Sequence, residues 1–289
     1  MGHVVEAVGE FSGFAFQMMQ KHSLSGVWTP SPLLYASGAL HLGAAASLIA
    51  RPHFWPWALS AVLANHVALA AAGLWPRSQL LGPNWTRLPA PGRTAMGVAL
   101  TIDDGPEPSV TPDVLAQLER YGARATFFCV GERVLRYPDL AQEIVRRGHT
   151  IENHSHSHRH NFSLLGPSGM RAEISRAQES IHRVTASTPL FFRAPAGLRN
   201  PFLDPILVRL KLRLASWTRR GFDTVNSNPD AVFKRLANPL RPGDILLLHD
   251  GHAARSRAGR AVIVEVLPRL LEAMNAKGLS PVTLRSALP

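Results

Sequence analysis

The chain has 289 residues, is 46% hydrophobic and carries a formal net charge of +11. This length allows one large domain plus an additional module, and the apolar content is ample for a buried core. The single cysteine, Cys129, excludes an internal disulfide, and no nucleic-acid-binding motif accompanies the positive charge, so nucleic acid is not an expected partner.

Two apolar stretches near the start of the chain predict an N-terminal membrane region covering residues 1–75. The predicted helices at 33–50 and 57–75 each approach the roughly 20 residues that a helix needs to cross a bilayer. Aromatic residues occur where membrane interfaces favour them, at Trp28, Trp55, Trp57 and Trp75. We interpret the pair as a transmembrane hairpin; a buried hairpin of a soluble protein is the alternative. Before it, a short amphipathic helix is suggested by Phe11, Phe14 and Met18.

Residues 76–95 are rich in Pro, Gly and Arg and are predicted to link the hairpin to a catalytic domain at 96–289. A hairpin places the N-terminus and the catalytic domain on one side of the membrane. The basic residues on that side are Lys21, Arg77, Arg87 and Arg93. Only Arg51 lies in the connecting loop, so the positive-inside rule favours the cytoplasmic face of a bacterial inner membrane, with the periplasmic face as the alternative.

Beyond residue 95, short apolar runs alternate with helical patterns, which predicts an α/β fold. Strands are expected near 97–102, 125–130, 190–193, 213–217 and 244–248. Helices are expected near 111–121, 138–147, 168–186, 230–237 and 259–276.

Two adjacent carboxylates, Asp103 and Asp104, follow the first of these strands. In α/β folds the carboxyl ends of strands form the edge where sites are built. Successive strand residues point to opposite faces, so one Asp can bind a metal while the other moves protons. An ordinary turn is the alternative interpretation, because Asp-Asp-Gly-Pro is also common turn chemistry.

A histidine-rich segment supplies further candidate ligands. The i,i+4 spacing of His154 and His158 would place both imidazoles on one face of a helical turn, ready for one cation. His156 and His160 share this spacing, so the local pattern does not decide which pair binds. A solvated His-Ser loop is the alternative.

Three more polar sets each follow an apolar strand-like run. They are Arg193 to Gly197, Trp217 to Asp223, and His249-Asp250-Gly251. With Thr101 to Pro106 and the histidine segment, these five sets in order resemble the polysaccharide deacetylases of the NodB-homology type, similar to carbohydrate esterase family 4. The resemblance covers about residues 97–284. It implies a distorted (β/α) barrel of about seven strands, here preceded by the α-helical transmembrane hairpin, with the site on the carboxyl-end loops.

The resemblance also implies roles for individual residues. Asp104, His154 and His158 would hold a divalent metal, with Zn²⁺ expected first and Co²⁺, Mn²⁺ or Ni²⁺ as alternatives. In this pattern His156 and His160 are left outside the ligand set. Roles in the reaction would fall to Asp103 as general base, Arg193 as its partner, the Ala196 N–H at the oxyanion, His249 as general acid and Asp223 as the partner of His249.

The predicted function is that of a membrane-anchored, metal-dependent hydrolase that removes N-acyl (acetyl) groups from an amino sugar in a glycan or glycan precursor. The alternative is a deformylase or deacetylase of an undecaprenyl-phosphate-linked sugar at the inner leaflet; a non-catalytic glycan-binding module is the third reading. Substrate contacts are predicted for Trp217, Arg219 and Arg220, because Arg suits phosphate recognition. The acyl group could differ from acetyl, since Ala194, Ala196 and Thr224 depart from the commoner family pattern. Membrane lipids are further expected partners.

Overall fold

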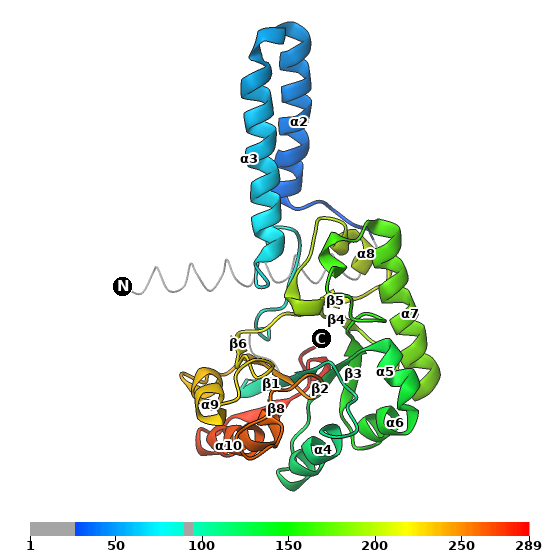
Figure 1. Ribbon diagram of the computed structural model, residues 1–289, viewed down its shortest axis with the longest axis vertical. Helices are drawn as coiled ribbons and strands as arrows, with labels where there is room; N and C mark the ends of the chain where they lie inside the picture. The colour runs from blue at the N-terminus through cyan, green and yellow to red at the C-terminus, as the bar shows by residue number, and fades with distance from the viewer. Residues whose placement is uncertain (1–26, 90–94, 289) are drawn as a thin grey trace.

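A computed structural model describes residues 27–89 and 95–288. It consists of a helical hairpin that projects from an α/β body (Figure 1). The predicted amphipathic segment around Phe11, Phe14 and Met18 lies outside the described residues, as do Lys21 and Arg93.

The hairpin is formed by α2 (Pro32–Ala50), the short turn η1 (Pro52–Phe54) and α3 (Trp55–Leu74). The Ser31 side chain accepts a hydrogen bond from the N–H of Leu34, which caps the start of α2. Between the helices, the Asn65 amide donates to the Ser37 hydroxyl at 2.9 Å. Both helices are long and apolar enough to cross a membrane, and only 6% of the first apolar window and 22% of the second are buried. Within the described chain, most of the surface of both helices is therefore exposed.

The body contains an open sheet in which all strand pairs are parallel. Its strands are β1 (Gly97–Asp103), β2 (Thr126–Cys129), β3 (Thr150–Asn153), β4 (Phe191–Phe192), β5 (Arg213–Leu214), β6 (Arg219–Arg220), β7 (Ile245–His249) and β8 (Ser280–Val282). Their order is β5-β4-β3-β2-β1-β7-β6, and β8 pairs with the first half of β1. In the described part of the chain the end strands β5 and β6 do not pair with each other, so the curled sheet forms an incomplete barrel, as the family resemblance implied.

Helices cover the outer face of this sheet, and short 3₁₀ turns connect several elements. The helices are α4 (Thr111–Arg120), α5 (Gly131–Arg136), α6 (Pro138–Arg146), α7 (Pro167–Thr185), α8 (Leu203–Arg209), α9 (Pro229–Ala237) and α10 (Val262–Ala276). The turns are η2 (Phe162–Leu164), η3 (Pro195–Gly197) and η4 (Arg285–Ala287). Each of the five predicted strands and five predicted helices corresponds to a strand or helix of the structure. The structure also contains β3, β6, β8, α5 and α8, which were not predicted.

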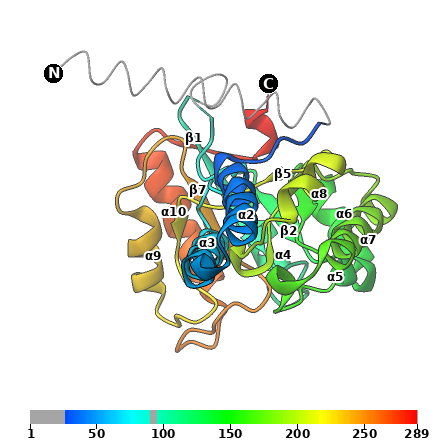
Figure 2. The ribbon, with the colours of Figure 1, turned by 90° about the horizontal axis from the view of Figure 1, so that it is seen from above.

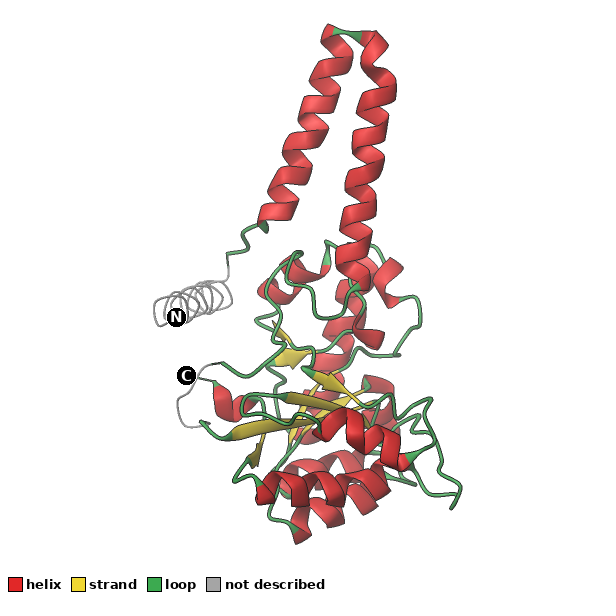
Figure 3. Ribbon diagram, turned by 90° about the vertical axis from the view of Figure 1, so that its left-hand side faces the viewer, coloured by secondary structure: helices red, strands yellow, loops and turns green. Residues whose placement is uncertain are grey.

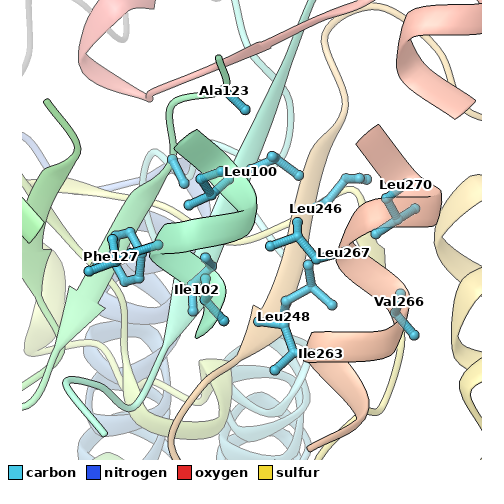
Figure 4. Packing of buried hydrophobic residues seen from close by; sticks show 14 of the residues in the cluster. Leu100, Ile102, Ala123, Phe127, Leu246, Leu248, Ile263, Val266, Leu267 and Leu270 are labelled. Atoms are coloured by element: carbon cyan, nitrogen blue, oxygen red, sulfur yellow. The ribbon is translucent and has the colours of Figure 1, made fainter. Parts of the chain in front are cut away.

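Alternation along β1 separates the hydrophobic core from the site. Leu100 and Ile102 point outward and pack with Leu246, Leu248 and the α10 residue Leu267 (Figure 4). Ala99 belongs instead to the cluster on the inner face of the sheet. By the same two-residue period, Thr101 and Asp103 point inward, which places the Asp103 carboxylate inside the barrel mouth.

The segment predicted as a linker is packed against the body. Trp85 forms a parallel bridge to Ala215, and Arg87 forms an antiparallel bridge to Asp244. The Arg87 guanidinium also contacts the Asp244 carboxylate at 2.7 Å. Trp85 is 6% exposed and joins the inner cluster. Residues 76–88 are therefore held in place as part of the α/β body rather than serving as a free tether.

The hairpin is attached to the body at both of its ends. The indole N–H of Trp28, just before α2, donates to the Asp204 carboxylate at 2.8 Å. At the end of α3, the carbonyl of Gly73 accepts from the Arg199 N–H, and beyond the helix the Arg199 guanidinium donates to the carbonyl of Ser78. Figure 3 shows the hairpin projecting from one side of the α/β body, with the sheet beneath it.

Candidate active site

The strand register brings the polar sets to one edge of the sheet. Asp103 is opposite His249 on β7 and opposite Phe128 on β2. On the other side, Asn153 is opposite Cys129 and Phe192, so the histidine segment and Arg193 leave neighbouring strands at the same edge. The sequence-predicted residues therefore meet because their strands end together.

Asp104, His154 and His158 form a cluster that could hold a metal ion, with one ligand atom from each within 4.8 Å of the others. The Nε2 atoms of His154 and His158 lie 3.2 and 3.1 Å from the same oxygen, Oδ1 of Asp104. Asp104 adopts a left-handed backbone conformation with φ of 74°. This turn, at the end of β1, directs its carboxylate toward both imidazoles.

The hydrogen-bond pattern around the Asp104 cluster is consistent with a bound cation. Nδ1 of His154 lies 2.8 Å from the carbonyl oxygen of Arg193, which fixes the proton on Nδ1 and leaves the Nε2 lone pair facing Asp104. Oδ1 of Asp104 is buried, and the described part of the chain gives it no hydrogen-bond donor of acceptable geometry. A lone pair facing a buried carboxylate is repulsive unless a proton or cation lies between them. The donor set of one carboxylate and two imidazoles suits a divalent transition metal.

The pKa values reflect the same crowding of charge. Burial acts to raise the pKa of Asp104, but its contacts with His154, His158 and His252 hold it well below its usual range. Burial acts to lower the pKa of His154, but Asp103 and Asp104 raise it. The site therefore favours an ionised carboxylate with positive charge beside it.

The predicted helical turn through His154 and His158 is wrong, because this segment is a loop. The loop is shaped by Ser155, whose N–H donates to the Asn153 side chain and whose hydroxyl accepts from the N–H of His158. His156 is buried away from the site, with its ring near Ser180. His160 is exposed and lines the outer part of the pocket.

Asp103 is held by a fully buried arginine. Nη1 of Arg193 donates to Oδ1 of Asp103 at 2.6 Å and to the hydroxyl of Thr101 at 2.8 Å. The rest of the guanidinium donates to the carbonyls of Ala215 and Ser216. Desolvation lowers the pKa of Arg193, although the neighbouring Asp103 charge opposes that effect. These bonds fix the orientation of the Asp103 carboxylate.

His249 forms a second buried pair with Asp223. Nδ1 of His249 contacts Oδ1 of Asp223 at 2.8 Å, and the His249 backbone N–H donates to Oδ2 at 2.7 Å. Burial acts to lower the pKa of His249, but the charge and hydrogen bond of Asp223 raise it to about 9. The Asp223 partner therefore favours the charged form of His249, which lines the pocket.

Asp103, Asp104, His154, His158 and His249 line one pocket with a volume of about 310 Å³, whereas Arg193 and Asp223 are buried behind it. Its wall includes the predicted residues Ala196, Trp217 and Arg220, together with Thr224. Ala196 has a left-handed backbone with φ of 55°. The Arg220 guanidinium lies over the rings of Trp217 and Phe222, and its Nε has no hydrogen-bond partner among the described residues.

Arg219 does not share this position. As its neighbour on β6, it points the other way, where its Nε donates to Asp244 at 3.0 Å and its Nη1 donates to the carbonyl of Asn238. The structure therefore does not bring Arg219 to the pocket with the other predicted residues, because its side chain forms an ion pair with Asp244.

Sequence reasoning missed His252, which also lines the pocket. Its Nδ1 lies 3.4 Å from Oδ2 of Asp104, and its side chain is 63% exposed. The contacts with Asp104 raise the pKa of His252. The sequence signal for His252 was its position three residues after His249. The strand pattern ends at His249, so it did not identify His252 as a site residue.

Close backbone packing holds the Asp104 turn in place. A Cβ added at Gly251 would lie 2.4 Å from the backbone oxygen of Asp104. We therefore predict that Gly251→Ala displaces Asp104 and lowers kcat/KM by up to about 100-fold, the size of effect that a 1 Å misplacement can cause. The matched control is Gly169→Ala in α7, where the added carbon meets only ordinary contacts. Equal activity of the two variants would contradict this prediction.

An incomplete α/β barrel with paired carboxylates and imidazoles at its carboxyl edge defines a hydrolytic type of site. Residues 92–215 match the family model described as polysaccharide deacetylase. The chain is 34% identical to a peptidoglycan-N-acetylglucosamine deacetylase of Bacillus cereus, over 60% of this chain and 81% of that one. It is 32% identical to a chitooligosaccharide deacetylase of Azorhizobium caulinodans, over 63% and 90% of the two chains.

A solved structure supports the same family assignment. A family 4 carbohydrate esterase from Streptomyces lividans, in complex with acetate, matches with a TM-score of 0.58 and 32% identity, over 64% of this chain and 91% of that chain. The chain belongs to the polysaccharide deacetylase family, whose members are hydrolases of N-acetyl amide bonds. The family resemblance that the five polar sets indicated is therefore confirmed.

Proposed function

We propose that this protein is a membrane-anchored, metal-dependent N-deacetylase of an amino sugar. The observation that carries the proposal is that one pocket is lined by the Asp104 cluster, by Asp103 and by His249. Arg193 pairs with Asp103, and Asp223 pairs with His249, from behind the pocket wall. Asp104, His154 and His158 would hold the metal, with Zn²⁺ as the first candidate and Co²⁺, Mn²⁺ or Ni²⁺ as the others. When bound, such an ion lowers the pKa of a water and polarises a carbonyl.

Different side chains of the protein then carry out the two proton transfers of the reaction. Asp103, fixed by Arg193, accepts the proton of the attacking water. The backbone N–H of Ala196 donates to the oxygen of the acyl carbonyl as negative charge develops there. His249 donates a proton to the departing amine, and Asp223 supports its charged form. Asp103 and His249 therefore act as base and acid in one turnover.

The acid role predicts a defined pH dependence. Replacing Asp223 by Asn removes the charge that raises the pKa of His249 to about 9, while burial remains. The pKa of His249 should therefore fall. Because a general acid acts only when protonated, the alkaline decline of kcat should move to lower pH. A pH profile of kcat on an N-acetylated oligosaccharide measures this shift; an unchanged alkaline limb would remove His249 from the acid role.

Membrane anchoring is supported by the exposure of the hairpin. Several large apolar side chains project from α2 and α3, with Leu42 75%, Ile49 85%, Trp57 75% and Val67 68% exposed. An apolar surface of this kind is unfavourable in water and suits lipid. We propose a two-pass anchor with the body on the cytoplasmic face, on the basis of the basic residues that flank the hairpin. A tag on the C-terminus that is accessible only after membrane permeabilisation would support that orientation.

The substrate is proposed to be a glycan or glycan precursor, by analogy with the peptidoglycan and chitooligosaccharide deacetylases that the chain resembles. A lipid-linked sugar is the second candidate, supported by the position of the pocket. Gly197, with φ of 74°, packs closely against Pro76, so a Cβ added at Gly197 would lie 2.7 Å from the Pro76 side chain. Pro76 is two residues after the end of α3. The pocket wall thus adjoins the base of the hairpin, and Arg220 lies in that pocket.

One experiment tests the activity and separates the two substrates. Full-length protein in detergent is stripped of metal, reloaded with Zn²⁺, and assayed on N-acetylated oligosaccharides and on undecaprenyl-phosphate-linked N-acyl sugars. Zn²⁺-dependent release of acetate or formate would support the proposed reaction, and the preferred substrate would choose between the two candidates. Absence of release from both, with metal bound, would contradict the proposal. If the lipid-linked sugar is preferred, Arg220→Ala should raise KM, whereas Arg219→Ala is the matched control.

A further inference from the structure

A second cleft lies outside the active site, between the hairpin and the body. Its volume is about 750 Å³, within the range of about 300–1,000 Å³ that is typical of pockets for small organic ligands. The hairpin side is formed by one face of α2, including Leu34, Tyr35 and Leu42. The body side is formed by α8 and the residues before it, including Phe202 and Ile206. Figures 1 and 2 show α8 beside the lower part of α2.

The cleft is apolar and open, yet large apolar side chains at its rim are exposed. Phe202 is 48% exposed, and Leu42 is 75% exposed. Leu164 of η2 is 82% exposed. Its loop is connected to the cleft by Asn200, whose amide donates to the carbonyls of Ser163 and Leu165 while its oxygen accepts from the N–H of Phe202. Exposed apolar groups at the base of a membrane hairpin indicate contact with lipid.

Charge at the cleft selects the kind of lipid. Arg209, at the end of α8, lines the cleft and is exposed, and Lys211 follows it as a second exposed cation. The acidic residue nearest to Arg209 in the sequence is Asp204. Asp204 is buried and accepts the Trp28 indole N–H, so it does not offset the exposed cations. Apolar walls with cations at the rim match an acyl chain joined to a negatively charged headgroup.

We propose that this cleft binds an anionic phospholipid of the surrounding bilayer, with an acyl chain against α2 and α8 and the phosphate beside Arg209. The inference rests on the membrane anchoring proposed above. In this arrangement Phe202 and Leu164 enter the lipid interface, so the body is held against the membrane at a second place besides the hairpin. The body is then held in one orientation, with the Gly197 wall of the active site close to the membrane surface.

The proposal is tested by spin labels that report depth in a bilayer. Cys129 is fully buried and is the only cysteine, so Cys129→Ala gives a background for single labels. Labels are placed by Phe202→Cys at the cleft, by Leu63→Cys on α3 and by Leu135→Cys on α5 as an exposed apolar control. The full chain is reconstituted in phosphatidylcholine vesicles with and without phosphatidylglycerol, and accessibility to oxygen and to a water-soluble nickel complex is compared.

We expect the label at 63 to be accessible to oxygen and the label at 135 to the nickel complex. The label at 202 should lose nickel accessibility, more so when phosphatidylglycerol is present. Arg209→Glu should abolish that dependence on phosphatidylglycerol, whereas Arg136→Glu on α5, an equal change of charge, should not.

Two outcomes overturn the proposal in distinguishable ways. A nickel-accessible label at 202 with an oxygen-accessible label at 63 refutes the lipid cleft and leaves the anchor intact. Nickel accessibility at both positions refutes the anchor and the cleft together. Protection at 202 that does not depend on phosphatidylglycerol or on Arg209 refutes the recognition of an anionic headgroup.

Discussion

Asp103→Asn is expected to lower kcat by about 10²–10⁴-fold, the range usual for loss of a positioned general base. Asn has nearly the same shape as Asp but cannot accept a proton from water at neutral pH. The amide oxygen can still accept the hydrogen bond that Nη1 of Arg193 donates at 2.6 Å, so the packing around Arg193 should persist. Because Asp103 is outside the group formed by Asp104, His154 and His158, metal binding should be retained.

The measurement is single-turnover deacetylation together with the metal content of the same sample. Asp250→Asn is the matched control, since Asp250 is a second buried carboxyl at this sheet edge but does not line the pocket. Burial raises the pKa of Asp250 to about 7, despite a hydrogen bond from Thr111, so its neutral form is already accessible. We expect the control to change kcat by less than about 10-fold, which is small beside the effect of losing a base. A fully active, metal-loaded Asp103→Asn protein would contradict the base assignment.

The fold could be predicted where strands are apolar throughout. β1 and β7 are runs of buried aliphatic residues, so their periodicity and following breaks identified them. β3 was not predicted, because two of its four residues are the polar Glu152 and Asn153. Glu152 is nonetheless buried, where it contacts Arg285 at 2.5 Å and accepts from two backbone N–H groups of the β4 region. These partners are distant in sequence, so the local pattern contained no sign that a charged residue could be inside.

The candidate site could be predicted as a set of residue types, but not in its geometry. The order of the polar sets indicated Asp104, His154 and His158, and the structure brings these three together. The helical turn was wrong because Ser155 and Asn153 shape a loop through side-chain hydrogen bonds, which periodicity does not register. Likewise, the opposite directions of Arg219 and Arg220 follow from strand alternation only once β6 is known to be a strand.

His158→Ala is expected to lower both metal occupancy and kcat/KM by at least about 100-fold, because loss of groups that merely support metal ligands already costs about 10–100-fold. The Nε2 of His158 lies 3.1 Å from Oδ1 of Asp104, and no other imidazole among the described residues faces that oxygen except His154. His252 contacts the other oxygen, Oδ2, at 3.4 Å and is more exposed, so it should not replace His158.

The matched control for His158→Ala is His160→Ala, two residues along the same loop. His160 lines the pocket, but no contact with Asp104 is found for it in the described chain. Metal content after dialysis against a weak chelator, measured beside kcat/KM, distinguishes the two histidines. If His160→Ala loses the metal and His158→Ala keeps it, the alternative pair with His156 and His160 is favoured, and the site would have to rearrange from the geometry seen here. If His158→Ala keeps its metal but loses activity, His158 acts on the substrate rather than as a ligand. Only loss of both metal and activity, confined to His158→Ala, supports the Asp104–His154–His158 site.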